Sequence, residues 1–160
     1  MTNSKEMSKV KHKLLKKTVL NGIFGGVFIG VFFFVMHYFN MTEVKPKLFL
    51  NLIFSDSKWI ERWYAYLILL VIFSIMSTIL ALVYYYLLRQ RKSWVVGAVY
   101  GGIIWGVLYY ISPILINNYN PFLNLNSESH ISMLCLFVLY GVFTGYSISF
   151  DYENIKEEYE

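Results

Sequence analysis

The sequence predicts an all-α integral membrane protein, a bundle of four transmembrane helices with both termini in the cytoplasm. The first observation is that four stretches of at least 22 residues contain no Asp, Glu, Lys or Arg, namely 18–42, 63–88, 93–127 and 129–150. A helix needs about 20 apolar residues to cross a hydrocarbon layer roughly 30 Å thick. The second observation is that 57% of the residues are apolar, above the roughly 45–50% of soluble domains.

The third observation is the uneven distribution of Lys and Arg among the segments that flank these stretches. Ten of the 14 lie in the N-terminal tail, the second connection and the C-terminal tail, four lie in the first connection, and none lies in the third. Because cytoplasmic segments of membrane proteins carry the excess of Lys and Arg, this asymmetry predicts cytoplasmic termini. Six lysines gather in the N-terminal tail, where we expect them to contact anionic lipid headgroups.

Residues 1–17 form a basic tail that we expect to be disordered or to lie on the membrane surface. The first span follows at about 18–39, and Asn21 lies one turn inside it, where its amide can reach the headgroups. The connection 40–62 contains an apolar stretch after Pro46 that is too short to span, so we predict one or two helical turns lying in the interface.

The second span, about 63–88, begins in aromatic residues typical of the headgroup level. A very short basic connector separates it from the third span, about 94–116. Pro113, near the end of that span, frees the carbonyl of Tyr109 and is expected to kink or end the helix.

A polar loop without Lys or Arg precedes the fourth span, about 130–150. The last segment, 151–160, is an acidic tail that we expect to be mobile. The predicted organisation is therefore a membrane domain, 18–150, between a basic tail and an acidic tail.

Small residues recur at every fourth position in three of the four spans. This spacing keeps them on one helix face, where the missing side chains let a second backbone approach closely. The stripes are Gly22, Gly26 and Gly30 in the first span, Gly97 with Gly101 and Ala98 with Gly102 and Gly106 in the third, and Gly141, Gly145 and Ser149 in the fourth. They indicate packing within the monomer or, for the first span, contact with a second copy or a partner.

A weak internal repeat relates segment 25–31 to segment 101–107, 76 residues later. Duplication of a helical hairpin would produce it, and so would chance, since glycine is common in membrane helices.

No recognisable catalytic or metal-binding arrangement occurs in the sequence. The spans contain no charged residue of the kind that marks ion or proton pathways, and His37 and His130 lie near predicted outer ends, where water can reach an imidazole. Cys135 is the only cysteine. We therefore expect no catalytic residue, no metal site and no cofactor. The basic clusters adjoin the spans and set topology, so we expect no nucleic-acid binding either.

Trp105 and Tyr109 lie deep in the third span, one turn apart on one face. Bundle packing explains such a pair, and an aromatic pocket is the other interpretation. In the second case Trp105, Tyr109 and Pro113 would line a pathway or pocket.

Several segments of the chain resemble the YqhR family of small membrane proteins from Bacillus-type bacteria. They are 37–43 at the outer end of the first span, 85–89, 94–101 and, most specific of all, 134–150. These segments reach across almost the whole chain outside the tails. The resemblance implies a bacterial plasma membrane and carries over no catalytic residue.

The sequence thus favours a non-enzymatic membrane protein that acts through helix–helix contacts with itself or with a membrane-protein partner. The alternative is a small oligomeric transporter or channel component for an uncharged or lipid-like substrate. A lipid-modifying enzyme is a third class, for which His37, Glu43, His130 and Asp151 are the scattered acid–base candidates.

Overall fold

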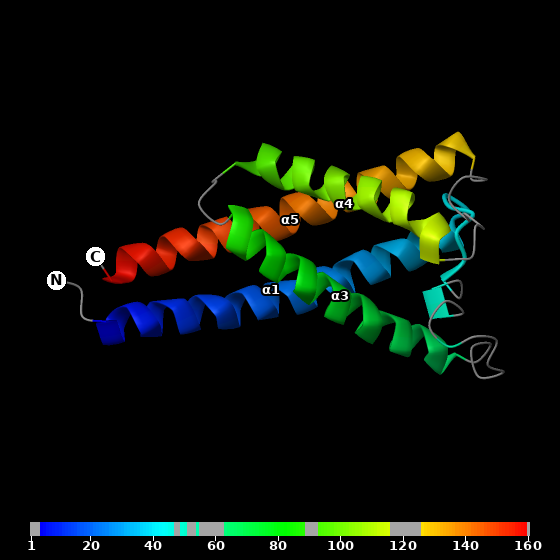
Figure 1. The fold of residues 1–160 in the computed structure, drawn as a ribbon. Coiled ribbons are helices and arrows are strands. Elements are labelled where there is room, and N and C mark those ends of the chain that lie inside the picture. Colours follow the sequence, from blue (N-terminus) through cyan, green and yellow to red (C-terminus); the bar gives the residue numbers. More distant parts are fainter. Residues whose placement is uncertain are drawn as a thin grey trace.

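The computed structural model describes residues 4–46, 49–50, 54, 63–88, 93–115 and 126–159. Within these ranges it contains four long α-helices and no strand (Figure 1): α1 (Ser4–Tyr38), α3 (Tyr64–Leu88), α4 (Trp94–Leu115) and α5 (Ser127–Tyr159). All four are long and apolar enough to cross a membrane. The predicted all-α fold with four membrane helices is therefore confirmed.

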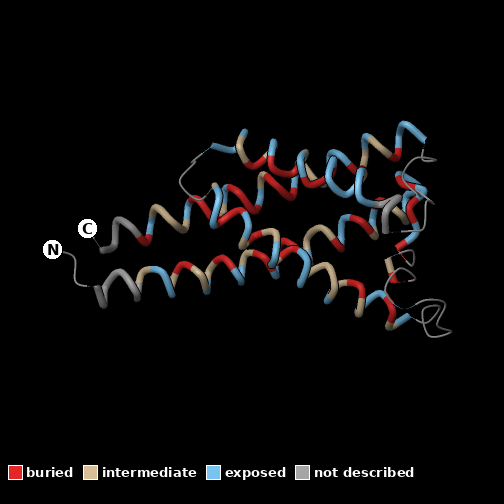
Figure 2. The backbone as a smooth tube through the Cα atoms, in the orientation of Figure 1, coloured by how far each residue is buried: buried red, intermediate tan, exposed pale blue. Residues whose placement is uncertain are grey.

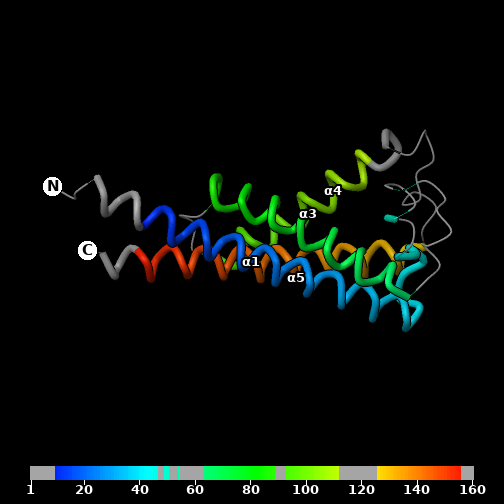
Figure 3. The backbone as a smooth tube through the Cα atoms, turned by 90° about the horizontal axis from the view of Figure 1, so that it is seen from below, coloured from blue at the N-terminus to red at the C-terminus, as the bar shows by residue number. Residues whose placement is uncertain are grey.

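The helices form two pairs that meet along one seam. Helix α1 packs against α3, α4 packs against α5, and α1 and α5 lie alongside one another and join the pairs, as Figure 1 and Figure 3 show from two directions. Both termini lie at the same end of the bundle, which we call the terminal end. Figure 2 shows buried residues on the facing sides of the helices and exposed residues on their outer sides.

The outer sides of the helices are apolar. Val71 on α3 and Ile103 on α4 are 58% and 57% exposed, and the residues four positions further on, Ile75 and Val107, are apolar and exposed as well. Apolar surface facing outward over a helix length of 25 residues is stable in hydrocarbon and costly in water. The burial pattern thus agrees with a bundle surrounded by lipid.

The two tails are helical, whereas we expected an N-terminal tail that is disordered or lies on the membrane surface and a mobile C-terminal tail. Helix α1 already begins at Ser4 and α5 continues to Tyr159. Leu14 and Ile155, 2% and 1% exposed, belong to one apolar cluster that also includes residues of α3 and α4. The tails are opposite in charge and leave the bundle at the same end, so each stabilises the other as a helix.

An ion pair joins the two helices where the tails begin. The Lys17 ammonium donates a hydrogen bond of 2.7 Å to one carboxylate oxygen of Asp151, and the Asn21 amide donates one of 2.9 Å to the other. We had predicted that the Asn21 amide serves only the headgroups; it is instead bound to a side chain of α5. The carboxylate lies across the helix seam, 130 residues away in the sequence.

Reversing one charge of this pair should weaken the seam. We expect Asp151→Lys to lower stability by about 1 kcal/mol, a typical value for a partly exposed ion pair, or a few degrees in Tm. The double variant Lys17→Asp with Asp151→Lys should recover most of the loss, because it restores opposite charges. Thermal unfolding in mild detergent measures both, and an unimproved double variant would show that the pair does not stabilise the seam.

Helix α1 ends in a left-handed cap. Asn40 has a φ of 55°, and the N–H groups of Met41 and Asn40 donate to the carbonyls of Met36 and His37 at 2.8 and 3.1 Å. This is the Schellman arrangement, in which Asn is one of the few non-glycine residues that tolerate the left-handed position.

Of the predicted interfacial helix, the structure describes Pro46, Phe49, Leu50 and Phe54, all helical. The rest of it lies outside the described residues. Leu50 is 1% exposed and packs with Ala65 and Leu69 of α3, so this element is anchored in the bundle.

The ends of α3 and α4 fall within one residue of the predicted spans. Pro113 lies in the last turn of α4 as bounded by Leu115, and the residues that follow are outside the described part of the chain. Helix α5 begins three residues before the predicted span.

Candidate helix-packing surface

The glycine stripe of α1 faces α3 of the same chain. A Cβ atom on Gly22 would lie 2.6 Å from the Cα of Thr78, and one on Gly26 would lie 2.7 Å from the carbonyl oxygen of Phe73. On Gly30 it would lie 2.5 Å from a terminal carbon of Leu70. Side-chain carbons essentially never come this close to other atoms. The stripe is therefore occupied within the monomer and is not available to a second copy.

A second glycine contact joins α4 and α5, and it involves glycines on both helices. A Cβ on Gly97 would lie 2.6 Å from the carbonyl oxygen of Gly141, and one on Gly141 would lie 2.6 Å from the amide nitrogen of Gly101. A Cβ on Gly145 would lie 2.9 Å from the Cα of Gly97. The two backbones touch directly, which lets dispersion contacts and weak Cα–H···O bonds hold the pair in lipid.

Gly102 and Gly106 differ from all the other glycines. A Cβ on either would meet no heavy atom of the described residues within 4 Å, whereas each of the other eight of the chain's ten glycines faces a neighbouring helix. Beside them lie Ile103 and Val107, 57% and 49% exposed. We call this part of α4 the open face, defined by Gly102, Ile103, Gly106 and Val107. It combines a flat backbone with two stiff β-branched ridges.

The internal repeat relates the open face of α4 to a face of α1 that holds another helix. An offset of 76 residues relates Gly25 to Gly101, and both of these contact α5: Gly25 lies against Tyr140 of α5 and equally against Ser77 of α3, and Gly101 lies against the backbone of Phe137. The same offset relates Gly26 and Gly30, which pack on α3, to Gly102 and Gly106 of the open face, and it relates Gly22 to Ala98. Equivalent faces of α1 and α4 thus contact α5, while the face that holds a helix on α1 is empty on α4.

Comparison with known proteins identifies the family. The family model described as "Conserved membrane protein YqhR" matches residues 1–160. The chain belongs to the YqhR family. It is similar to the "Uncharacterized protein YqhR" of Bacillus subtilis (strain 168), with 26% identity over 125 residues, which cover 78% of this chain and 70% of that protein. No solved structure matches it. A membrane protein of a Bacillus-type family is thus shown.

The YqhR-family chain also has a polar contact in its core that the sequence reading missed. The hydroxyl groups of Ser77 on α3 and Tyr140 on α5 lie 2.9 Å apart, and that of Tyr140 also lies 3.1 Å from the Ser77 carbonyl oxygen. The Tyr100 hydroxyl of α4 donates to the carbonyl oxygen of Leu80 at 2.7 Å. Tyrosines within apolar spans were the available signal, because a buried hydroxyl needs a partner.

The predicted pathway residues Trp105 and Tyr109 lie in a packed aromatic cluster away from the terminal end. Trp105 is 9% exposed and stacks on Phe137, with ring centres 5.7 Å apart and 27° between the planes. Tyr109 lies 6.2 Å from Trp105 and 5.8 Å from the ring of His130. The side chain of Pro113 lies outside the described residues. Packing therefore accounts for both rings in this YqhR-family fold.

The scattered acid–base candidates are brought together only in part. The Glu43 carboxylate accepts a hydrogen bond of 2.6 Å from the Asn126 side chain, and the carbonyl of Asn126 lies 3.3 Å from His130 Nδ1. Asp151 lies at the other end of the bundle, bound to Lys17. Within the described part of the chain, no three His, Cys, Asp or Glu residues are placed to hold a metal ion.

Proposed function

We propose that this YqhR-family protein is a non-enzymatic component of the bacterial plasma membrane that acts by packing against another membrane helix, from a second copy or from a partner protein. The open face of α4 is the contact surface. The observation that carries the proposal is that no described residue lies against Gly102 or Gly106, while every other glycine faces a helix.

The physical argument concerns the cost of glycine in a helix. Each glycine in a helix interior destabilises it by roughly 0.5–1 kcal/mol relative to alanine. Eight glycines offset that cost by letting two backbones approach each other. On the open face nothing within the chain does so. A helix packed there would offset it, and Ile103 and Val107 would lose little side-chain entropy because β-branched residues are already restricted.

The proposal includes a cytoplasmic terminal end, which the bias of Lys and Arg supports. Lys11 and Lys16 are exposed on the extension of α1, so they are free to contact anionic headgroups. Lys17 is committed to Asp151 instead. Lipid binding by the tail then rests on fewer lysines than the sequence contains.

Substitution of the open face should abolish association and leave the fold intact. We expect Gly102→Ile and Gly106→Ile to weaken self-association at least tenfold, about 1.4 kcal/mol, because a branched side chain would hold the second backbone away. Energy transfer between donor-labelled and acceptor-labelled copies in lipid vesicles measures it. Cys135→Ile is the matched control, since Cys135 is also exposed but lies on α5.

The result would also separate self-association from a heterologous contact. If the wild-type protein does not associate with itself, a membrane protein that co-purifies with it should be lost from Gly102→Ile and retained by Cys135→Ile. Association that is unchanged in both open-face variants, with the same partners retained, would contradict the proposal.

A further inference from the structure

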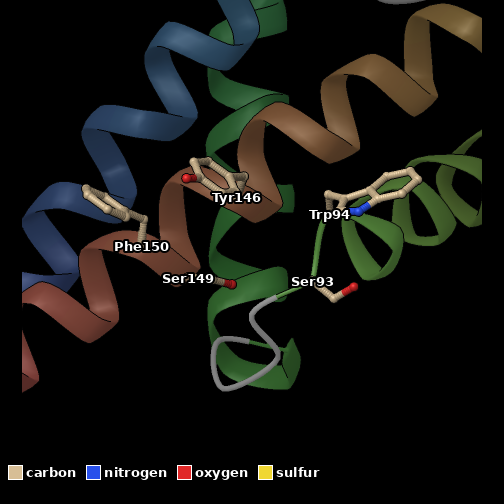
Figure 4. Close-up of a pocket in the computed structure, with 5 residues that line it drawn as sticks. All are labelled: Ser93, Trp94, Tyr146, Ser149 and Phe150. Atoms are coloured by element: carbon tan, nitrogen blue, oxygen red, sulfur yellow. The ribbon is translucent and has the colours of Figure 1, made fainter.

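Hydroxyl groups gather inside the bundle one helical turn further from the terminal end than the pocket shown in Figure 4. That pocket is lined by Ser93, Trp94, Tyr146, Ser149 and Phe150. Its walls are mostly apolar, carry no charge and are open to the surrounding lipid, so they favour no class of ligand. The enclosed site beside it, where α3 meets α5, is different in chemistry.

Four hydroxyl groups meet at this site, two from each helix, and we call them the hydroxyl junction. They belong to Ser77 and Tyr84 of α3 and to Tyr140 and Thr144 of α5, all of them buried. Glycines make room for them. A Cβ on Gly25 would lie 3.1 Å from Ser77 Oγ and 3.3 Å from Thr144 Oγ1. A Cβ on Gly145 would lie 2.9 Å from Tyr84 Oη.

Two of the four hydroxyls have a partner and two have none among the described residues. Ser77 and Tyr140 bind each other at 2.9 Å. The Tyr84 and Thr144 hydroxyls form no hydrogen bond with any described residue, although both side chains are 0% exposed. A buried hydroxyl without a partner is costly because it has given up its hydrogen bonds to water. The junction therefore calls for a ligand that can bind hydroxyls.

The direction of the Thr144 side chain supports this reading. Hydroxyls inside helices commonly donate to the carbonyl four residues earlier, and those of Thr18, Ser74 and Thr78 do so at 3.0, 2.8 and 2.7 Å. Thr144 Oγ1 makes no such bond and lies against Gly25 of α1 instead. It is thus turned away from its own helix and into the junction.

The Tyr84 hydroxyl is held in place by its ring. The rings of Tyr84 and Tyr100 pack edge to face, with centres 5.1 Å apart and 74° between the planes. The hydroxyl lies over Gly145, the residue that follows Thr144 in α5. Both unpartnered hydroxyls therefore lie at consecutive positions of one helix, where a single small molecule can serve both.

Chemistry and size select water as that molecule. The polar groups of the junction are uncharged hydroxyls, which do not offset the cost of bringing an ion into the membrane core. The close packing around Gly25 and Gly145 excludes a larger ligand. Water both donates and accepts hydrogen bonds, and a buried water typically satisfies two to four otherwise unpaired polar groups.

We propose that the hydroxyl junction binds an ordered water molecule that bridges Tyr84 of α3 and Thr144 of α5. The bridge joins one helix pair to the other, as do the contact between Ser77 and Tyr140 and the hydrogen bond from Tyr100 of α4 to the Leu80 carbonyl of α3. The site is independent of the open face of α4 and does not require the proposed helix-packing role.

Hydroxyl-radical labelling of the full chain in mild detergent tests the site. X-rays convert water into radicals that react close to where they form, so a buried side chain is oxidised only if a water molecule lies beside it. Tyr84 should be oxidised several times faster than Tyr85, the next residue, which is also 0% exposed. Thr144→Val keeps the branched shape without the hydroxyl, and it should lower the Tyr84 rate to that of Tyr85.

Thr18→Val is the matched control. Thr18 is a buried threonine of a membrane helix too, but its hydroxyl already donates to the Leu14 carbonyl, so this variant should leave the Tyr84 rate unchanged. Thermal unfolding gives a second readout: Thr144→Val should lower Tm if it breaks a bridge, whereas removing an unpaired hydroxyl would raise it.

Three results would each overturn the proposal. Oxidation of Tyr84 as slow as that of Tyr85 in the wild type would show that no water lies beside Tyr84, and this comparison requires no variant. An unchanged Tyr84 rate in Thr144→Val would show that Thr144 does not hold the water. A higher Tm of Thr144→Val would show that its hydroxyl has no partner at all.

Discussion

Gly26→Ile should prevent α1 from packing on α3 and so prevent the monomer from folding. The first carbon of any side chain at this position would lie 2.7 Å from the carbonyl oxygen of Phe73 and from the amide nitrogen of Ser74. These are backbone atoms, which cannot rotate away as a flexible side chain can. Overpacking a core ordinarily costs about 1–3 kcal/mol, and we expect the upper end or more here, because the two helices must separate along their whole contact.

The expected observation is loss of the monodisperse peak in size-exclusion chromatography in mild detergent, together with a lower yield. Gly102→Ile is the matched control: it is the same substitution in another membrane helix, but at a position with nothing within 4 Å. It should still give a monodisperse peak and a Tm close to that of the wild type, even where it weakens association between copies. A Gly26→Ile protein as stable as Gly102→Ile would show that α1 and α3 do not pack as described.

From the sequence alone, substitution of Gly26 is a natural test of association between copies, because Gly26 belongs to a glycine stripe on one helix face. In the structure, Gly22, Gly26 and Gly30 are covered by α3. Loss of association in Gly26→Ile would therefore report a broken monomer, and only Gly102 and Gly106 report on an interface.

Gly141→Val should release α4 from α5. A Cβ on Gly141 would lie 2.6 Å from the amide nitrogen of Gly101 and 2.7 Å from the Cα of Gly101. Helix α4 has its main packing contact with α5, and to α3 it is joined through the Tyr100 hydroxyl. Separating the two backbones removes most of what positions α4, whereas α1, α3 and α5 keep their own contacts.

Cysteine accessibility measures this release. In a Cys135→Ser background, Val138→Cys places a thiol on α5 opposite Gly101, where the residue is half-buried. A lipid-soluble maleimide should label it slowly in the parent and several times faster with Gly141→Val. Leu139→Val is the control, since Leu139 is 52% exposed on the lipid side of α5. Equal labelling in all three proteins would contradict the backbone contact between α4 and α5.

Much of the fold could be predicted because the length and hydropathy of a span depend only on residues that are neighbours in the sequence. A run without charge is long enough or too short to cross a membrane whatever else the chain contains. For that reason the ends of α3 and α4 were found within one residue. The tails were predicted wrongly because their helices depend on each other: neither the lysines before Lys17 nor the acids after Asp151 indicate by themselves that the two segments meet. Their opposite charges were the signal that was available.

For the candidate helix-packing surface, too, the sequence predicts one part and the tertiary structure decides another. Spacing of four identifies Gly22 with Gly26, Gly97 with Gly101 and Gly102 with Gly106 equally, since all three pairs lie on one face of a helix. Which pair is covered depends on where the other helices lie, and the spacing contains no information on that. The internal repeat becomes informative only once α3 is seen on α1 and nothing is seen on the equivalent face of α4.

By itself, then, the sequence determined that this is a four-helix membrane protein and which helix faces allow close approach, because hydropathy and spacing are local properties of a chain in lipid. Only the tertiary structure decided which helices meet: α1 with α3, α4 with α5, and the two tails through Lys17 and Asp151. It alone also showed that Gly102 and Gly106 are left open. The physical reason is that packing in lipid is driven by shape and hydrogen bonds between specific partners, so it depends on residues far apart in the chain.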